Sequence, residues 1–164
     1  MPTSPPIRWG RVSWWAFLSD PFDLRPAPDG HHIHASCIAF QSRALLIGGP
    51  SGSGKSSLAL ELMAFGAALV ADDVTELYVA DSALMARAPA TLPEAIEARG
   101  LGLLPARLAG PCRVIAALDL GRRSAERLPQ SRTILLLNQA IPLLHRPASG
   151  PVPAMLLQYL RHGR

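Results

Sequence analysis

Apolar residues are grouped into short runs along most of the chain, and the spacing within each run predicts the element that it forms. Residues 33–40 have the composition of a strand, and residues 44–47 form a shorter run in which every position is apolar. Residues 56–65 differ, because their apolar positions recur every three or four residues and Gly66 follows as a stop signal. The pattern predicts two strands, then a glycine-rich loop, then a helix.

The remainder of the chain contains more strand patterns than helix patterns. Six further strands are expected, at residues 68–71, 75–79, 83–88, 113–120, 133–137 and 141–145. The second and third of these should form a hairpin around Asp81 and Ser82. Residues 99–104 contain too many glycines for a helix, whereas residues 155–161 should form a closing helix. We therefore expect an α/β domain with a mixed β-sheet and few helices.

The length of 164 residues provides for one domain with a core of its own. Residues 1–30 are rich in proline and tryptophan, and we interpret them as an irregular N-terminal arm that precedes a catalytic domain at residues 31–164. The aromatic side chains of the arm either dock on the domain or a neighbouring subunit, or belong to a partly disordered extension. The aromatic cluster consists of Trp9, Trp14, Trp15 and Phe17.

The composition argues against several classes of protein. No apolar run reaches the roughly 18–20 residues of a membrane span, and Cys37 and Cys112 lack the spacing of metal ligands. A reduced, cytoplasmic protein is the simplest interpretation. The net charge of +4 is spread over scattered arginines, and aromatic residues make up only 5% of the chain, which argues against nucleic acid as a partner.

The segment between the second predicted strand and the helix carries the clearest motif. It reads Gly49, Pro50, Ser51, Gly52, Ser53, Gly54, Lys55 and Ser56. This order matches a phosphate-binding loop (P-loop), whose glycines let successive N–H groups turn toward phosphate oxygens at the positive end of the following helix. Lys55 should reach the β- and γ-phosphates of ATP, and the Ser56 hydroxyl should bind Mg²⁺.

Lysine usage strengthens this assignment. Of the 16 Lys and Arg residues, all but Lys55 are arginines. A base-composition bias explains why lysine is rare, but it does not explain why the one lysine stands where a compact, flexible ammonium is needed over phosphates. A glycine-rich turn without a ligand is the alternative, and it gives no reason for the position of Lys55.

Two adjacent carboxylates, Asp72 and Asp73, end the strand predicted at residues 68–71. They follow Lys55 by only 17 and 18 residues, which is unlike most motor or transporter ATPases. Strand alternation should point the two side chains in opposite directions, so that one faces a metal ion and the other faces a hydroxyl as general base. A solvated turn is the alternative.

These features together resemble the HPr kinase/phosphorylase family. The resemblance rests on His34, the loop at 49–56, the run 69–73 and the run 96–102, in that order and at similar spacing. It covers roughly residues 31–130 and is closest to the catalytic domain alone, as in short members of the family. It implies a P-loop fold related to that of phosphoenolpyruvate carboxykinases.

The resemblance also implies roles for individual residues. His34 corresponds to an active-site histidine, although a histidine in the His31-His32-His34 group is more often a surface residue when taken alone. Asp73 corresponds to the residue that takes the serine proton, and Asp72 to a support of metal and phosphate. Glu97 corresponds to a second Mg²⁺ ligand; a surface charge pair with Arg99 is the alternative.

Arg127 is a candidate for an arginine that contacts the transferred phosphate, and a surface arginine is the other interpretation. The sequence also departs from the family pattern. Ala35 replaces the glycine that usually follows the histidine, and a larger N-terminal domain is not recognisable. The Arg- and Gly-rich loop associated with dephosphorylation is also not recognisable, and residues 145–147 are its nearest remnant.

The resemblance therefore implies an ATP- and Mg-dependent serine kinase that acts on an HPr-like phosphocarrier protein. The departures make the reverse phosphorolysis a weaker expectation than kinase activity. The family implies a homo-oligomer, although its usual hexamer is less secure without the larger domain. Two alternatives stay open: a kinase of a peptide or small hydroxylated metabolite, and a nucleotide-binding regulatory module without catalysis.

Overall fold

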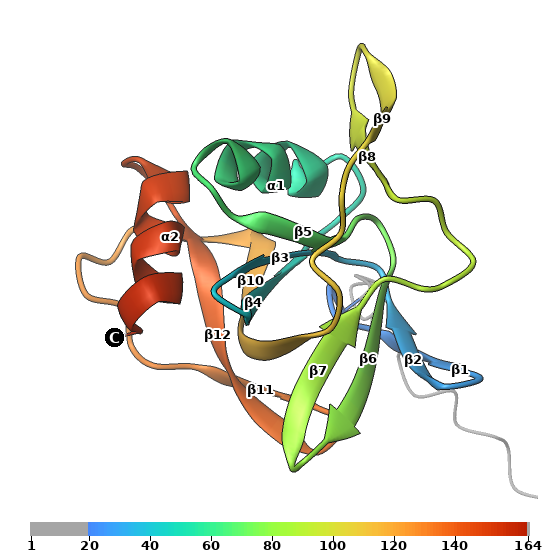
Figure 1. The fold of residues 1–164 in the computed structure, drawn as a ribbon. Coiled ribbons are helices and arrows are strands. Elements are labelled where there is room, and N and C mark those ends of the chain that lie inside the picture. Colours follow the sequence, from blue (N-terminus) through green and yellow to red (C-terminus); the bar gives the residue numbers. More distant parts are fainter. Residues whose placement is uncertain (1–19, 164) are drawn as a thin grey trace, which may run out of the picture.

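The computed structural model describes residues 20–163, which form one large curled sheet with two helices on one side and a small separate hairpin (Figure 1). The strands are β1 Leu24–Ala27, β2 Gly30–Ile33, β3 Ser36–Phe40, β4 Arg43–Gly48, β5 Ala68–Ala71, β6 Thr75–Ala80, β7 Ala83–Arg87, β8 Ala95–Ala98, β9 Gly102–Pro105, β10 Cys112–Ser124, β11 Thr133–Leu136 and β12 Gln139–Pro147, and the helices are α1 Lys55–Ala64 and α2 Val152–His162.

The large sheet is mixed, as the sequence predicted. Its main path runs β1-β2-β6-β7-β10-β4-β3-β5, and β12 pairs with β10 and with β11. The 13-residue strand β10 pairs in parallel with β4 and β12 and in antiparallel with β7. Because β10 is long enough to pair with β7 at its start and with β12 further along, β12 branches from the main path of the sheet at β10.

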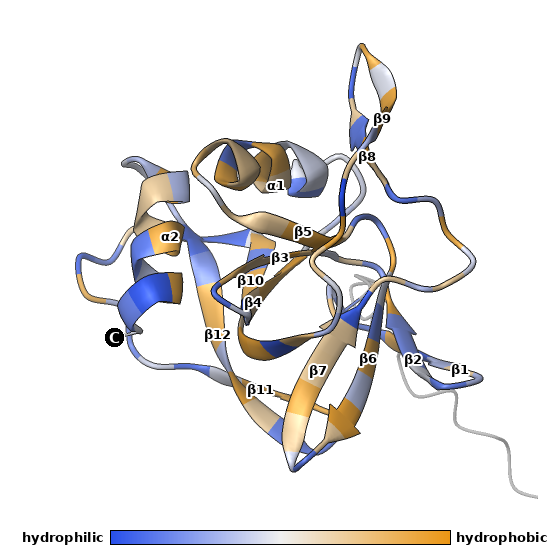
Figure 2. Cartoon of the chain, in the orientation of Figure 1, coloured by the Kyte–Doolittle hydropathy of each residue, from blue (hydrophilic) through white to orange (hydrophobic). Residues whose placement is uncertain are grey.

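The central strands are buried on both faces, which explains their nearly continuous apolar runs. One core cluster includes Leu46, Val70 and Leu77 and contains no residue of either helix. The other includes Leu45 and Ile47 and packs against the apolar faces of α1 and α2. Figure 2 shows these apolar residues concentrated on the inner strands. Within residues 20–163, neither helix has the length and apolarity to span a membrane.

Three expectations about the elements were wrong in detail. The strand expected at residues 33–40 is divided between β2 and β3, because the chain leaves β6 after Ile33 and joins β4 and β5 from Ser36 onward. Residues 24–27, expected in an irregular arm, form β1 as the antiparallel partner of β2. The closing helix begins at Val152, three residues early, because Pro153 lies in its first turn, where proline is tolerated.

The β8–β9 hairpin was not predicted and projects from the sheet beside α1 (Figure 1). Its turn uses Gly100 and Gly102 at φ 91° and 106°. The aromatic cluster of the arm lies outside the described residues.

Candidate active site

The phosphate-binding loop connects the end of β4 to the start of α1, as expected. Gly49 has φ 143°, and a Cβ at this position would lie 2.8 Å from Ser53 Oγ and 3.1 Å from Leu120 Cβ. Gly54 caps α1 in the left-handed region, with φ 94° and ψ 27°. Only glycine meets both the backbone and the space requirement at residue 49. The hydroxyl of Ser53 is buried in this loop without a hydrogen-bond partner in the protein, so a phosphate oxygen would satisfy it.

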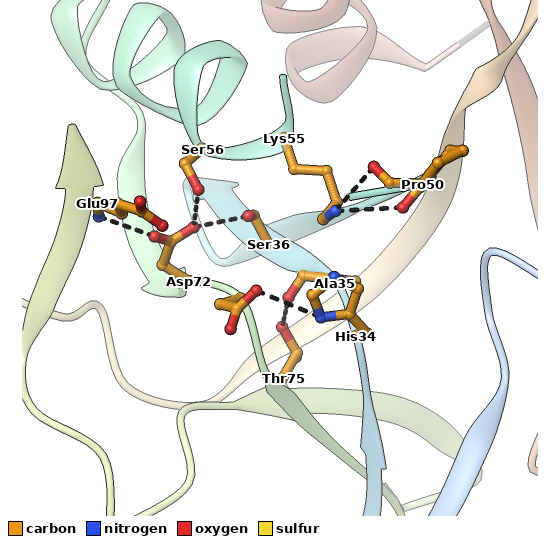
Figure 3. Close-up of polar contacts among 11 residues, drawn as sticks. His34, Ala35, Ser36, Pro50, Lys55, Ser56, Asp72, Thr75 and Glu97 are labelled. Carbon is orange, nitrogen blue, oxygen red and sulfur yellow. Dashed lines mark hydrogen bonds and ion pairs between the residues drawn. The ribbon is translucent and has the colours of Figure 1, made fainter. Parts of the chain in front are cut away.

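Lys55 is the first residue of α1 and is 7% exposed. Its Nζ donates hydrogen bonds to Gly49 O at 3.1 Å and to Pro50 O at 3.3 Å, so the ammonium lies against the loop (Figure 3). Burial lowers the pKa of Lys55, and the nearby carboxylates of Asp73 and Asp72 partly oppose that shift. A polyphosphate at the loop would supply the negative charge that this desolvated cation lacks.

Asp72 connects three elements around the loop. Its Oδ1 accepts hydrogen bonds from Ser36 Oγ at 2.7 Å and from Ser56 Oγ at 2.8 Å, and its Oδ2 accepts one from Glu97 N at 3.0 Å (Figure 3). The carboxylate therefore ties β3, α1 and β8 together. Ser36 was missed from the sequence, because a serine that begins a strand gives no signal of this contact.

His34 and Asp73 form a second pair at the same site. His34 Nδ1 lies 3.3 Å from Asp73 Oδ1, and the two side chains are 51% and 66% exposed. His34 lies in the bend between β2 and β3, next to Ala35, whose carbonyl accepts a 2.8 Å hydrogen bond from Thr75 Oγ1. Asp73 lies beyond the end of β5 at φ 63°. A left-handed turn, and not strand alternation, therefore separates the two aspartate side chains.

A cleft of about 330 Å³ brings these groups together. It is lined by His34, Ser51, Gly52, Gly54, Lys55, Ser56, Ser57, Asp73, Glu97 and Arg99. Asp72 lies beneath the lining and supports it through Ser56 and Glu97. Arg99, whose segment the sequence singled out without giving this residue a role of its own, enters the cleft from the β8–β9 hairpin. Arg127 does not line the cleft; it borders a different cavity, with residues of β12 and α2.

The donors at the loop are suited to magnesium. Hydroxyl and carboxylate oxygens are available from Ser56, Asp72 and Glu97, which are hard ligands of the type that Mg²⁺ prefers. Residues 20–163 contain no cluster of three or more His, Cys, Asp or Glu side chains arranged to hold a metal. This donor set still fits Mg²⁺, because the ion commonly uses one or two protein carboxylates together with substrate phosphates and water.

Comparison with known proteins identifies the family of the chain. Residues 28–110 match the HPr Serine kinase C-terminal domain family. The HPr kinase/phosphorylase of Aromatoleum aromaticum is 45% identical over 76 residues, and that of Xanthomonas campestris pv. campestris is 43% identical over 76 residues. Each alignment covers 46% of this chain and 24% of the relative, so the chain matches about a quarter of the length of these proteins.

The fold has a solved counterpart as well. A structure of the Hpr(Ser) kinase/phosphatase from Coxiella burnetii superimposes with a TM-score of 0.67 at 22% identity and covers 79% of this chain and 88% of that one. At this identity the likeness concerns the fold. It confirms the expected α/β fold with a mixed sheet.

Proposed function

Because the chain belongs to the HPr serine kinase C-terminal domain family, we propose that it is an ATP- and Mg-dependent serine kinase whose acceptor is an HPr-like phosphocarrier protein. The whole curated relatives are about four times longer than the part that matches, so their names alone do not assign the activity or acceptor of this chain. The proposal therefore depends on what the cleft residues can do.

The phosphate end of the cleft is built to hold a polyphosphate. The loop amides, the Ser53 hydroxyl and Lys55 surround the position where phosphates would lie at the N-terminus of α1. Ser56, Asp72 and Glu97 would hold Mg²⁺, which neutralises charge on the phosphates when bound. The protein's own contribution is positioning and electrostatic stabilisation, which account for most of the catalysis of phosphoryl transfer.

The acceptor end is formed by Asp73. Its carboxylate is 66% exposed at the cleft, so a serine on the surface of another protein can reach it. Asp73 would accept the serine proton while the serine oxygen attacks the γ-phosphorus and ADP leaves. His34, 3.3 Å away, would orient the Asp73 carboxylate and stabilise its charge. The juxtaposition of the His34–Asp73 pair with Lys55 in one cleft is the observation that carries the proposal.

The test is transfer of labelled phosphate from [γ-³²P]ATP, with Mg²⁺, to purified HPr, with Asp73→Asn as the control enzyme. Phosphoserine on HPr with the wild-type protein, and its absence with Asp73→Asn, is the expected result. Label on a small molecule and never on HPr would replace the protein acceptor with a metabolite. Tight ATP binding without transfer to any acceptor would instead support a nucleotide-binding regulatory module.

A further inference from the structure

A cavity of about 220 Å³ is lined by residues of β12, of α2 and of the segment 125–132, which connects β10 to β11 (Figure 1). It shares no lining residue with the catalytic cleft. Arg127, for which the family resemblance suggested a contact with the transferred phosphate, lines this cavity instead. The proposed function therefore gives neither the cavity nor Arg127 a role.

Two backbone hydrogen bonds hold the ends of the connecting segment against β12 and the residue that follows it. At one end, Ala148 N donates to Ser124 O at 2.9 Å. At the other end, Leu143 N donates to Arg132 O at 2.9 Å. Because both ends of the segment are fixed in this way, it forms a defined wall of the cavity, and binding sites for small molecules are usually preformed in the same sense.

The walls that β12 and α2 contribute are largely apolar. Leu143 and Leu144 of β12 are half-buried, and Leu156 of α2 is buried beside Met155, which is 44% exposed. Part of this apolar surface is in contact with water in the protein alone. A ligand that covers it removes apolar surface from water, which favours binding. These walls are therefore suited to an alkyl or aryl group.

The charged side chains of the lining are two arginines and one glutamate, which give it a formal charge of +1 with His145 counted as neutral. Arg132 lies 4.0 Å from Glu126, at the limit of an ion pair, and Arg127 forms no ion pair within residues 20–163. An unpaired arginine is common on a protein surface. Arg127 differs from most of them because it lines a largely apolar cavity, where its guanidinium can bind a carboxylate through two parallel hydrogen bonds.

We infer that this cavity binds a small organic monocarboxylate with an apolar body. The carboxylate binds at Arg127 and Arg132, and the apolar body packs against β12 and α2. The formal charge of +1 favours a carboxylate over a phosphate monoester, whose charge is about −1.5 to −2 at pH 7. The volume of about 220 Å³ is below the roughly 300–1,000 Å³ of sites for drug-sized ligands, so the ligand is small. The inference does not depend on the proposed function, because the cavity and the cleft have no lining residue in common.

The test measures the affinities of the whole chain for octanoate, octanamide and octyl phosphate by calorimetry at pH 8. Octanamide has the same alkyl chain as octanoate and a polar end of similar shape without a charge. The wild-type protein is expected to bind octanoate about tenfold or more tightly than octanamide, and also more tightly than octyl phosphate. Arg127→Ala should weaken octanoate binding about tenfold and change octanamide binding by less than about twofold, because only octanoate loses a charge-assisted hydrogen bond.

Glu126→Gln provides a second variant, in which the affinity should increase. It removes the negative charge from the lining, so octanoate should bind about threefold more tightly, as expected for the loss of one nearby like charge. Damage to the fold would lower the affinity and would not produce this gain. Both Glu126 and Arg127 are exposed, so neither substitution disturbs the core.

Arg146→Ala is the matched control, because Arg146 belongs to the same strand, β12, but lines a different cavity beside α1. It should bind octanoate as the wild-type protein does. Equal wild-type affinities for octanoate and octanamide, or an equal loss of octanoate binding in Arg146→Ala and Arg127→Ala, would overturn the carboxylate site. Tighter binding of octyl phosphate than of octanoate would overturn a monocarboxylate as the ligand, and binding of none of the three would overturn the site itself. Transfer of phosphate to HPr is measured separately, so these outcomes are distinguishable from failure of the proposed function.

Discussion

Ser56 Oγ donates a 2.8 Å hydrogen bond to Asp72 Oδ1, so the end of the phosphate-binding loop is tied directly to the residue that follows β5. The same oxygen accepts a 2.7 Å hydrogen bond from Ser36 Oγ. Ser36 is completely buried, and its hydroxyl depends on this carboxylate. Asp72 is therefore a structural support of the loop as well as a candidate metal ligand, and the two roles can be separated experimentally.

Asp72→Ala is expected to lower the free energy of unfolding by about 1–3 kcal/mol, because it leaves the buried Ser36 hydroxyl without its acceptor. Ser36→Ala removes the hydrogen-bond donor instead and should lower the free energy of unfolding by less than Asp72→Ala does. Urea denaturation of the two single variants and the double variant measures the coupling between them. Equal stability of Asp72→Ala and the wild-type protein would show that the carboxylate does not support the fold.

Asp73→Asn tests the proposed general base. Asparagine has nearly the same shape but cannot accept the serine proton, so transfer to HPr should fall by about 10²–10⁴-fold. ATP affinity should stay within about threefold, because Asp73 is 66% exposed and does not belong to the loop. Single-turnover rates and ATP titrations with the same preparation distinguish a lost base from a lost nucleotide site. Full transfer by Asp73→Asn would exclude Asp73 as the base.

Gly49→Ala should damage the loop without unfolding the domain. The added Cβ would lie 2.8 Å from Ser53 Oγ and 3.1 Å from Leu120 Cβ at a backbone φ of 143°. We expect ATP affinity to fall by more than tenfold and stability by about 1–3 kcal/mol. Gly66→Ala is the control, since Gly66 also has a positive φ but an added Cβ would have no atom within 4 Å. Gly66→Ala should lower the stability without lowering the affinity for ATP. A loss of ATP affinity as large as that of Gly49→Ala would contradict a local effect at the loop.

Short-range patterns were sufficient to predict the centre of this fold. The strand, loop and helix at residues 43–64 follow from an apolar run, a glycine motif and helical spacing, which are all local in the sequence. The β6–β7 hairpin was recognisable for the same reason, since Asp81 and Ser82 both adopt the left-handed conformation that its tight turn requires.

The features that were missed depend on contacts between distant segments. The division at residues 34–35 arises because β2 pairs with β6 whereas β3 pairs with β4 and β5. Pairing partners cannot be inferred from an apolar run. The β8–β9 hairpin was not predicted, because the glycines in this segment argued against a helix but gave no pattern typical of a strand.

The candidate site likewise contains residues that could be identified from the sequence and residues whose role depends on contacts between distant segments. Residues near the loop motif were identified with the help of the family resemblance, and the structure brings His34, Lys55, Ser56, Asp73 and Glu97 into one cleft. Arg127 was a candidate through the family resemblance, and it lines another cavity. Ser36 had no sequence signal, because its role depends on a partner 36 residues away.

Both cysteines should be unreactive in the folded protein. Burial raises the pKa of the Cys37 thiol well above its usual value, with a further contribution from Cys112, and burial also raises the pKa of Cys112. Thiolate is the reactive form, so iodoacetamide at pH 8 should modify neither residue within the time that glutathione reacts fully. Modification followed by mass spectrometry should appear only as urea unfolds the protein. Prompt alkylation of Cys37 without urea would contradict its burial in β3.

As the pH is raised, the affinity for nucleotide should begin to decline at a lower pH than it would if Lys55 had the usual pKa of a lysine. Burial lowers the pKa of Lys55 in the free protein, and the proposed interaction with phosphates requires the charged ammonium. Affinity should therefore be constant below that pKa and fall by up to about tenfold per pH unit above it, as the ammonium loses its proton before binding. ATP titrations between pH 7 and about 10.5, the usual lysine pKa, measure this decline. Lys55→Arg is the control, because guanidinium keeps its charge throughout this range, although its different shape should weaken binding at every pH. The same alkaline decline in Lys55→Arg would show that another group is responsible.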